Sequence, residues 1–288
     1  MTTRERNGVL AILGANIIFG VSFIATRMVF DAGMTIFGLL FWRFALASLV
    51  LSLLYKAKVL KLNLTFKRWL ALFPLAVCDP IIYYIGESIG IAKTGSAISG
   101  TLIAMIPIAT LISARLFLKE KHTLLQVLAV VVSVGGVVLI AFTGADGNFA
   151  AEPMGYLLLL VAVLAAAAYQ ILVKFKDNLY TAMEMVFGIA LYGLIFYGSC
   201  GIIEAAVTNN FYRLILLPFD QPLVLLLVIA LAMVSTIGAF CLFNYAISAI
   251  GPTRCSVFAG VMSVTSIICG IVVLDEVLSI SQLCGALM

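Results

Sequence analysis

Long apolar stretches alternate along the chain with short segments that carry most of its charged residues. Seven stretches contain no Asp, Glu, Lys or Arg: residues 7–26, 94–114, 123–145, 153–173, 185–203, 221–253 and 255–274. Two further stretches, at about 34–55 and 69–92, are equally apolar but include Arg43, Asp79 and Glu87. A helix needs about 20 apolar residues to cross the ~30 Å hydrocarbon core of a bilayer. The pattern therefore predicts nine membrane-spanning helices.

A tenth apolar segment begins at about Val277 and reaches Met288 after about 12 residues. At ~1.5 Å of rise per residue, this segment is too short to cross a bilayer. We therefore expect an all-α integral membrane protein with ten transmembrane helices, the last of which is truncated in this chain.

The sequence also contains an internal repeat. Four positions recur in the same order and at the same spacing, first as Gly95, Leu118, Glu120 and Gln126 and then as Gly251, Leu274, Glu276 and Gln282. The repeat divides the chain into a first half, residues 1–145, and a second half, residues 146–288. Because each half holds an odd number of helices, the halves should be inverted repeats. Such repeats enclose a site near the bilayer midplane and open it to either side in turn; a duplication that only assists assembly is the alternative.

Composition excludes a soluble domain. Of the 288 residues, 64% are hydrophobic and only 10% are charged, and the mean hydropathy is +1.21. Soluble globular domains carry about 25% charged residues.

The basic residues predict the orientation. With a cytoplasmic N-terminus, thirteen Lys and Arg residues fall in inside segments, and only Arg27, Lys93 and Arg213 fall outside. Such an excess marks the cytoplasmic side. We expect a multi-pass protein of the cytoplasmic membrane whose N-terminus is cytoplasmic.

Several short segments resemble the EamA family of the drug/metabolite transporter superfamily. They are FGVSFIATR at 19–27, FWRF at 41–44, LFLKEK at 116–121, IGP at 250–252 and VLDE at 273–276. The resemblance covers nearly the entire chain. It implies ten helices, cytoplasmic termini and the export or exchange of small metabolites, often amino acids.

Arg43 and Glu87 are charged residues at similar expected depths in the second and third helices. Charges inside a membrane are costly and usually functional. Arg43 can hold an anionic group such as a substrate carboxylate, because its planar guanidinium group suits bidentate contact. The alternative is an Arg43–Glu87 ion pair that only neutralises two buried charges and fixes the helix packing.

Asp79, Tyr83 and Glu87 are spaced four residues apart and so lie along one helical stripe. Glu87 and Asp79 are candidates for proton coupling, because a carboxyl group shielded from water holds a proton more readily. Asp79 precedes Pro80, where a helix often kinks. The alternative role for Asp79 is to satisfy backbone groups that this kink frees.

Uncharged polar and aromatic residues complete the candidate substrate site. They are Asn16, Trp42, Tyr83, Tyr169, Gln170, Asn244 and Tyr245, with aromatic walls from Phe19 and Tyr84. Such groups suit the fixing of a ligand by hydrogen bonds. For any single one, hydrogen bonding between helices, worth about 1 kcal/mol, is the alternative.

No cofactor or metal is expected. The six cysteines show no C-x-x-C spacing, and His122 is the only histidine; a metal site needs more ligands. The basic residues at 56–68 act as a topology signal and attract anionic lipid headgroups rather than nucleic acid. The expected partners are a small-molecule substrate, such as an amino acid or related metabolite, and membrane lipids. We expect a monomer or weak homodimer.

Three classes of function fit an apolar, multi-helical chain. A secondary transporter is favoured over an integral-membrane enzyme, because the sequence offers no nucleophile with its base, no metal cluster and no glycine-rich phosphate loop. A membrane-embedded assembly subunit is the third class. Solute counterflow in liposomes separates the first class from the other two.

Overall fold

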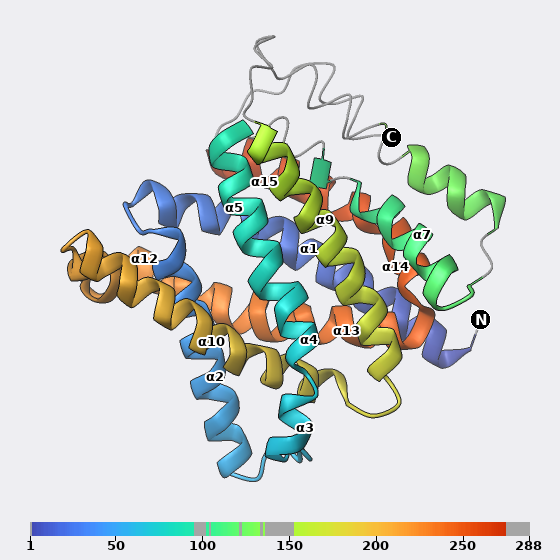
Figure 1. The fold of residues 1–288 in the computed structure, drawn as a ribbon, viewed down its shortest axis with the longest axis horizontal. Helices are drawn as coiled ribbons and strands as arrows, with labels where there is room; N and C mark the ends of the chain where they lie inside the picture. Colours follow the sequence, from blue (N-terminus) through green and yellow to red (C-terminus); the bar gives the residue numbers. More distant parts are fainter. Residues whose placement is uncertain are drawn as a thin grey trace.

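The computed structural model describes residues 2–94, 102–103, 105–120, 123–132, 135 and 153–274, and within these ranges the chain is helical with short connections (Figure 1). The predicted tenth helix, the repeat positions Gly95, Glu276 and Gln282, and most of the predicted fifth helix lie outside the described residues.

The first half begins with two long helices, α1 (Thr3–Asp31) and α2 (Ile36–Lys56). Each begins at a threonine N-cap. In α1, the Thr2 hydroxyl accepts from the backbone N–H of Glu5, and the Glu5 carboxylate accepts from the N–H of Thr2. This capping box satisfies two backbone donors that a helix start leaves unpaired.

The third predicted helix is broken into short elements. They are α3 (Phe66–Leu70), α4 (Phe73–Ala76), the π-helical η1 (Val77–Ile82) and α5 (Tyr83–Thr94). Asp79 has non-helical torsion angles, with φ −144° and ψ 119°. Pro80 explains the break, because a proline forces the residue before it towards extended conformations. The next described helix is α7 (Ile106–Phe117).

The second half repeats the pattern of long helices with one broken segment. It comprises α9 (Pro153–Lys176), α10 (Ala182–Val207), η2 (Tyr212–Leu216), α11 (Leu217–Asp220), α12 (Pro222–Ala230), the π-helical η3 (Leu231–Ala239), α13 (Phe240–Ile250), α14 (Pro252–Val257) and α15 (Ala259–Leu274). The apolar run predicted to reach residue 253 ends at Gly251, whose φ of +84° requires glycine.

Among the described residues, six segments are long and apolar enough to cross a membrane: Thr3–Asp31, Ile36–Lys56, Phe66–Glu87, Pro153–Lys176, Ala182–Val207 and Pro222–Ile250. α7 is a shorter apolar helix. The prediction of an all-α, multi-pass membrane protein is therefore confirmed.

Helices of the two halves interlock. α1 packs against α13 and α15, α2 against α10, and α5 against α9, which run side by side in Figure 1. α7 packs against α9 and α14. Each of these pairs joins a helix of the first half to one of the second, so the halves share one interior.

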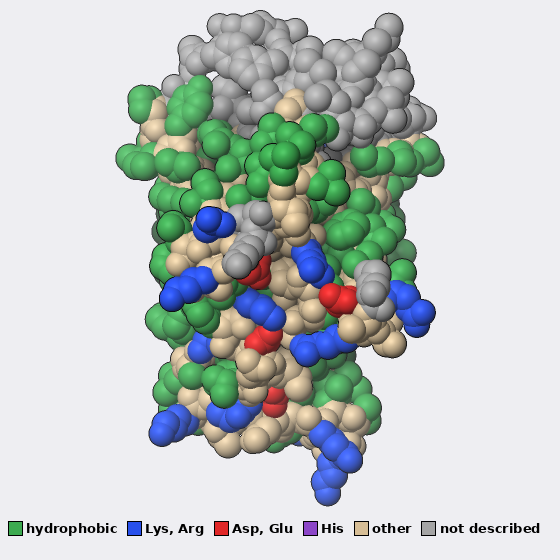
Figure 2. All heavy atoms as spheres, turned by 90° about the vertical axis from the view of Figure 1, so that its right-hand side faces the viewer, with side chains coloured by type: hydrophobic (Ala, Val, Ile, Leu, Met, Phe, Trp, Pro, Cys, Tyr) green, Lys and Arg blue, Asp and Glu red, His purple; other side chains and the backbone are tan. Residues whose placement is uncertain are grey.

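One end of the bundle gathers charged residues, and we call it the charged end. Here Glu5 at the start of α1 pairs with Arg254 of α14 at 3.1 Å, and Lys174 near the end of α9 pairs with Asp177 at 2.8 Å. Lys174 also donates to the backbone oxygen of Ser248, near the end of α13. Figure 2 looks onto this end and shows Lys, Arg, Asp and Glu side chains across it, with hydrophobic side chains on its flanks.

A hydrophobic core lies between the charged end and the middle of the bundle. Its buried members include Ile12, Leu72, Tyr169, Met185 and Ile247. They come from α1, the region before α4, α9, α10 and α13, so this core fills the space that five separate segments enclose.

Candidate functional site

Arg43 is buried within α2, with 5% of its surface exposed. Its Nε donates to the Thr236 hydroxyl at 3.2 Å and its Nη2 to the Ser235 hydroxyl at 3.3 Å. The guanidinium carbon also lies 5.9 Å from the centre of the Tyr84 ring. Within the described residues no salt bridge joins Arg43 to Glu87, so the ion pair considered from the sequence is not formed. In the part of the chain that the structure describes, the partners of Arg43 are neutral and no carboxylate contacts it.

Ser235 and Thr236 were not identified from the sequence. Both are buried and lie in η3. π-helical turns are rare and often occur at functional sites. The available signal was weak: two adjacent hydroxyl residues in an apolar, charge-free stretch.

Glu87 lies one turn beyond Tyr83 on α5. The Tyr83 hydroxyl donates to Glu87 Oε1 at 2.9 Å. This contact reflects the four-residue spacing, which places the two side chains on one face of the helix. A tyrosine hydroxyl adjusts easily to a carboxyl group in either protonation state, because it both donates and accepts.

Asp79 lies in the helix break, one turn before Tyr83. Its Oδ1 is buried and makes no hydrogen bond to any described residue. It interacts electrostatically with both Glu87 and Arg43. Buried polar atoms are nearly always hydrogen-bonded, so an orphaned carboxylate oxygen calls for an explanation such as a ligand.

Tyr197 of α10 contacts the backbone at the helix break. Its hydroxyl donates to the carbonyl oxygens of Pro80 at 2.9 Å and Ile81 at 3.3 Å. The role of Asp79 in satisfying backbone groups at the break, considered from the sequence, stays a prediction.

Tyr169 and Asn244 bring the second half into the same region. The Tyr169 hydroxyl donates to Asn244 Oδ1 at 2.8 Å, and both residues are buried. Asn244 Nδ2 makes no hydrogen bond within the described part of the chain. Tyr169 interacts electrostatically with Asp79 and Tyr84.

These residues form one group, which we call the central polar cluster. Its members come from α2, η1, α5, α9 and α13: Arg43, Asp79, Tyr83, Tyr84, Glu87, Tyr169 and Asn244. It contains two carboxyl groups, one guanidinium group, and two buried polar atoms that lack partners.

Three other candidate residues lie apart from this cluster and make contacts between elements. Asn16 Nδ2 donates to the backbone oxygen of Phe258, where α14 gives way to α15. Gln170 donates to Thr110 of α7, and Trp42 donates to the backbone oxygen of Leu214 in η2. For these three, the contacts are the interhelical hydrogen bonds named as the alternative.

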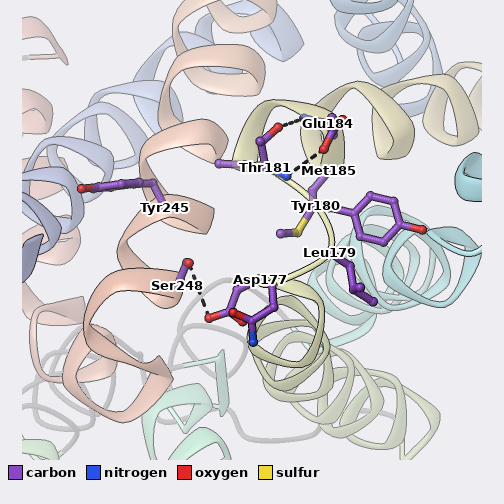
Figure 3. A pocket seen from close by; sticks show the side chains of 10 residues that line it. Asp177, Leu179, Tyr180, Thr181, Glu184, Met185, Tyr245 and Ser248 are labelled. Atoms are coloured by element: carbon purple, nitrogen blue, oxygen red, sulfur yellow. Dashed lines mark hydrogen bonds between the residues drawn. The ribbon is translucent and has the colours of Figure 1, made fainter. Parts of the chain in front are cut away.

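Tyr245, the remaining candidate, is 37% exposed and lines a cavity of about 330 Å³ near the charged end. Figure 3 shows this cavity between α13, which contributes Tyr245 and Ser248, and the connection from α9 to α10. Its carboxylates are already engaged. Asp177 contacts Lys174 and Ser248, and Glu184 accepts from the backbone N–H of Thr181. Among the candidate residues, the buried polar atoms without a described partner, Asp79 Oδ1 and Asn244 Nδ2, therefore lie in the central polar cluster.

A second cavity, of about 320 Å³, adjoins the cluster. Tyr84 and Tyr197 form part of its wall, and its other lining residues are Ile36, Phe37, Leu40, Ile85, Ile89 and Lys93. They come from α2, α5 and α10.

Membrane transport proteins are among the proteins built as a bundle of membrane-spanning helices around a buried polar cluster. Residues 6–142 and 153–288 match the model of the EamA-like transporter family. The chain therefore belongs to this family, which confirms the resemblance found in the sequence.

Relatives that carry curated names agree with this class. An "Uncharacterized transporter YcxC" of Bacillus subtilis is 28% identical over 93% of this chain and 86% of its own length. The "WAT1-related protein At2g40900" of Arabidopsis thaliana is 30% identical over 44% of this chain and 34% of its own. A protein solved by crystallography superposes with a TM-score of 0.77 at 16% identity, covering 97% of this chain and 92% of its own, and so shares the fold.

Proposed function

We propose that the protein is a secondary active transporter that exports or exchanges small metabolites such as amino acids across the cytoplasmic membrane. The central polar cluster is its substrate site. One observation carries the proposal: buried groups of both charge signs lie together in the cluster without contacting each other. Among the described residues, Arg43 contacts neutral hydroxyls and the Tyr84 ring, and Asp79 Oδ1 has no hydrogen-bond partner.

An amino acid zwitterion supplies the missing partners. Its carboxylate suits Arg43, which has further N–H donors, and the unpaired Nδ2 of Asn244. Its ammonium group suits Asp79 and the nearby Glu87. Burying a charge is costly unless it is paired, so a ligand that pairs both signs at once offsets the desolvation of both.

The arrangement of helix ends supports two inverted five-helix halves. The start of α1 and the end of α9 lie at the same charged end, so the first helix of each half runs in the opposite direction to its counterpart. The two family matches, one on each side of residues 143–152, support the same division. Exchanging the conformations of inverted halves provides alternating access.

The basic residues support placing the charged end in the cytoplasm. The hydrophobic core on that side of the central polar cluster supports a conformation closed towards the cytoplasm. Opening then requires α9, α10 and α13 to separate at that end. Because both halves belong to one chain, a monomer is sufficient for the cycle, and a homodimer adds no residue to the site.

Proton coupling would use Glu87, with Asp79 as the second carboxyl group. The groups that face Glu87 are Tyr83, which donates to it, and Arg43, which interacts with it electrostatically. Asp79 also interacts with Glu87. Loss of a proton from Glu87 would change the charge beside the substrate ammonium and so couple proton release to substrate binding.

Counterflow tests the proposal. Purified protein is reconstituted into liposomes loaded with an unlabelled amino acid, and uptake of the same labelled amino acid is followed for a panel of amino acids and related metabolites. We expect saturable uptake that requires the loaded solute. If no solute moves while the protein is folded in the liposomes, the assembly-subunit or enzyme class replaces transport.

A further inference from the structure

The 320 Å³ cavity between α2, α5 and α10 begins where the central polar cluster ends. Tyr84 belongs to both, since its ring lies 5.9 Å from the Arg43 guanidinium carbon and also lines the cavity. Leu40, another lining residue, lies one turn before Arg43 on α2 and is 4% exposed. A molecule held at Arg43 therefore has this cavity within reach of its remaining atoms.

The cavity extends away from the charged end. Ile36 is the first residue of α2, and Lys93 is next to the last residue of α5. Near these helix ends, Thr35 donates to Glu204 at 2.7 Å, which marks the opposite end of the bundle. The cavity therefore leads from the cluster towards the side that the basic residues predict to be external.

The chemistry of its walls differs from that of the cluster. Ile36, Phe37, Leu40, Ile85 and Ile89 line it with hydrocarbon side chains, and the Tyr197 hydroxyl already contacts the carbonyls of Pro80 and Ile81. Lys93, the charged lining residue, lies at the end of the cavity away from the cluster. Apolar cavities hold water poorly. An apolar group that moves from solvent into such a cavity gains the free energy of leaving water and displaces few ordered water molecules from the protein.

The size of the cavity limits what fits. Sites for whole ligands span roughly 300–1,000 Å³, so this volume lies at the lower limit. It has room for one bulky side chain of a molecule whose head is held at the central polar cluster.

We infer that this cavity is the side-chain subsite of the transporter, and that it selects substrates with a zwitterionic head and a bulky apolar side chain. This inference rests on the proposed function, because the head is placed at the central polar cluster. The residues that determine specificity are Leu40 and Ile85.

Substituting the walls tests the subsite without altering the cluster. Ile85→Trp and the milder Leu40→Phe reduce the space, and Leu49→Trp is the matched control, because Leu49 is on α2 with 54% of its surface exposed. Each variant is first checked for a single symmetric peak in gel filtration. Counterflow is then measured for leucine, phenylalanine, alanine and glycine.

We expect wild-type protein to prefer leucine and phenylalanine over glycine by about tenfold or more, as a hydrophobic pocket allows. Ile85→Trp and Leu40→Phe should reduce this preference while alanine counterflow changes little, and Leu49→Trp should keep the preference. The subsite inference is overturned if wild-type protein transports all four amino acids at equal rates. It is also overturned if the wall variants lower the counterflow rate of all four by the same factor.

A binding assay separates this failure from failure of the transport proposal. The shift in melting temperature of detergent-purified protein is measured with leucine and with glycine. If leucine raises the melting temperature of wild-type protein but not of Ile85→Trp, the subsite is supported even where counterflow is absent. Equal shifts with both amino acids, or no shift with either, contradict it.

Discussion

The Thr253 hydroxyl donates a hydrogen bond of 2.6 Å to Oε2 of Glu120, and this contact joins the end of α7 in the first half to the start of α14 in the second. Gly251 lies beside it, with φ +84° and ψ 157°. A Cβ atom on Gly251 would lie 2.8 Å from Glu120 Oε1. The turn between α13 and α14 therefore needs both the close approach and the backbone conformation that only glycine allows.

Gly251→Ala should destabilise the protein by about 1–3 kcal/mol, since its backbone region is essentially restricted to glycine. The measurement is the melting temperature of purified protein. Gly14→Ala is the matched control, because its Cβ would meet only Leu242 at an ordinary 3.5 Å. Equal melting temperatures for the two variants would show that the turn tolerates a side chain.

Tyr197→Phe should destabilise the region around the helix break. The substitution keeps the ring that stacks on Phe44 but removes the hydroxyl that donates to the carbonyl oxygens of Pro80 and Ile81. The Pro80 oxygen keeps the backbone N–H of Tyr83, so we expect the cost of one lost hydrogen bond, about 0.5–1.5 kcal/mol. The check is thermal unfolding, with the exposed Tyr156→Phe as control. A melting temperature unchanged relative to that control would mean that another group satisfies these carbonyls.

Long apolar helices could be predicted from the sequence because their limits depend on local features. α1, α2, α9 and α10 follow from apolar runs between charged residues, and threonine N-caps mark the starts of α1, α2 and α10. The break at Asp79 was expected from Pro80. The positive φ at Gly251 and the π-helical η3 were not, because both depend on packing between elements far apart in the chain.

Only those contacts of the candidate site that form within one helix could be predicted from the sequence. Tyr83 and Glu87 contact each other along one helix, which the spacing predicts. The partners of Arg43 lie more than 190 residues away, and nothing local distinguishes Ser235 or Thr236 from other polar residues in apolar helices. Trp42 donates to Leu214 of η2, whereas its neighbour Arg43 donates to η3, and which of these partners each side chain meets depends on how the helices pack.

Glu87→Gln should separate exchange from proton coupling. The amide keeps the size of the side chain and can still contact Tyr83, but it cannot take up a proton. We expect counterflow to continue and acceleration by a pH gradient to be lost. The measurement is uptake into liposomes with and without an imposed pH gradient.

If a pH gradient still accelerates uptake by the Glu87→Gln variant, Glu87 is not the proton-coupling residue. Asp79→Asn, tested in parallel, shows whether the second carboxyl group takes that role. Both variants must first show wild-type yield in reconstituted liposomes.

Equivalent connections in the two halves should face opposite sides of the membrane. Asp31 precedes the connection between the first two helices of the first half, and Asn178 lies in the matching connection of the second. With a cytoplasmic N-terminus, Asp31→Cys should react with a membrane-impermeant thiol reagent in intact cells. Asn178→Cys should react only after permeabilisation, and the wild-type chain gives the background from native cysteines.

Labelling of both introduced cysteines from the same side would rule out inverted halves. Labelling with the two sides exchanged would keep the inversion and reverse the orientation.

The most direct test of the substrate site compares two variants with two altered substrates. The inhibition constant in counterflow is measured for the best amino acid, for its amide, which lacks the carboxylate, and for its N-acetyl form, which lacks the ammonium group. Wild-type protein should bind both altered forms more weakly. In Arg43→Ala, the ratio of the inhibition constant for the amide to that for the amino acid should fall by about 5- to 100-fold, while the ratio for the N-acetyl form stays unchanged. In Asp79→Asn, the ratio for the N-acetyl form should fall by a similar factor, while that for the amide stays unchanged, as expected for charged hydrogen bonds. The exposed Arg115→Ala should change neither. If Arg43→Ala and Asp79→Asn keep the wild-type discrimination in full, the central polar cluster is not where the substrate binds.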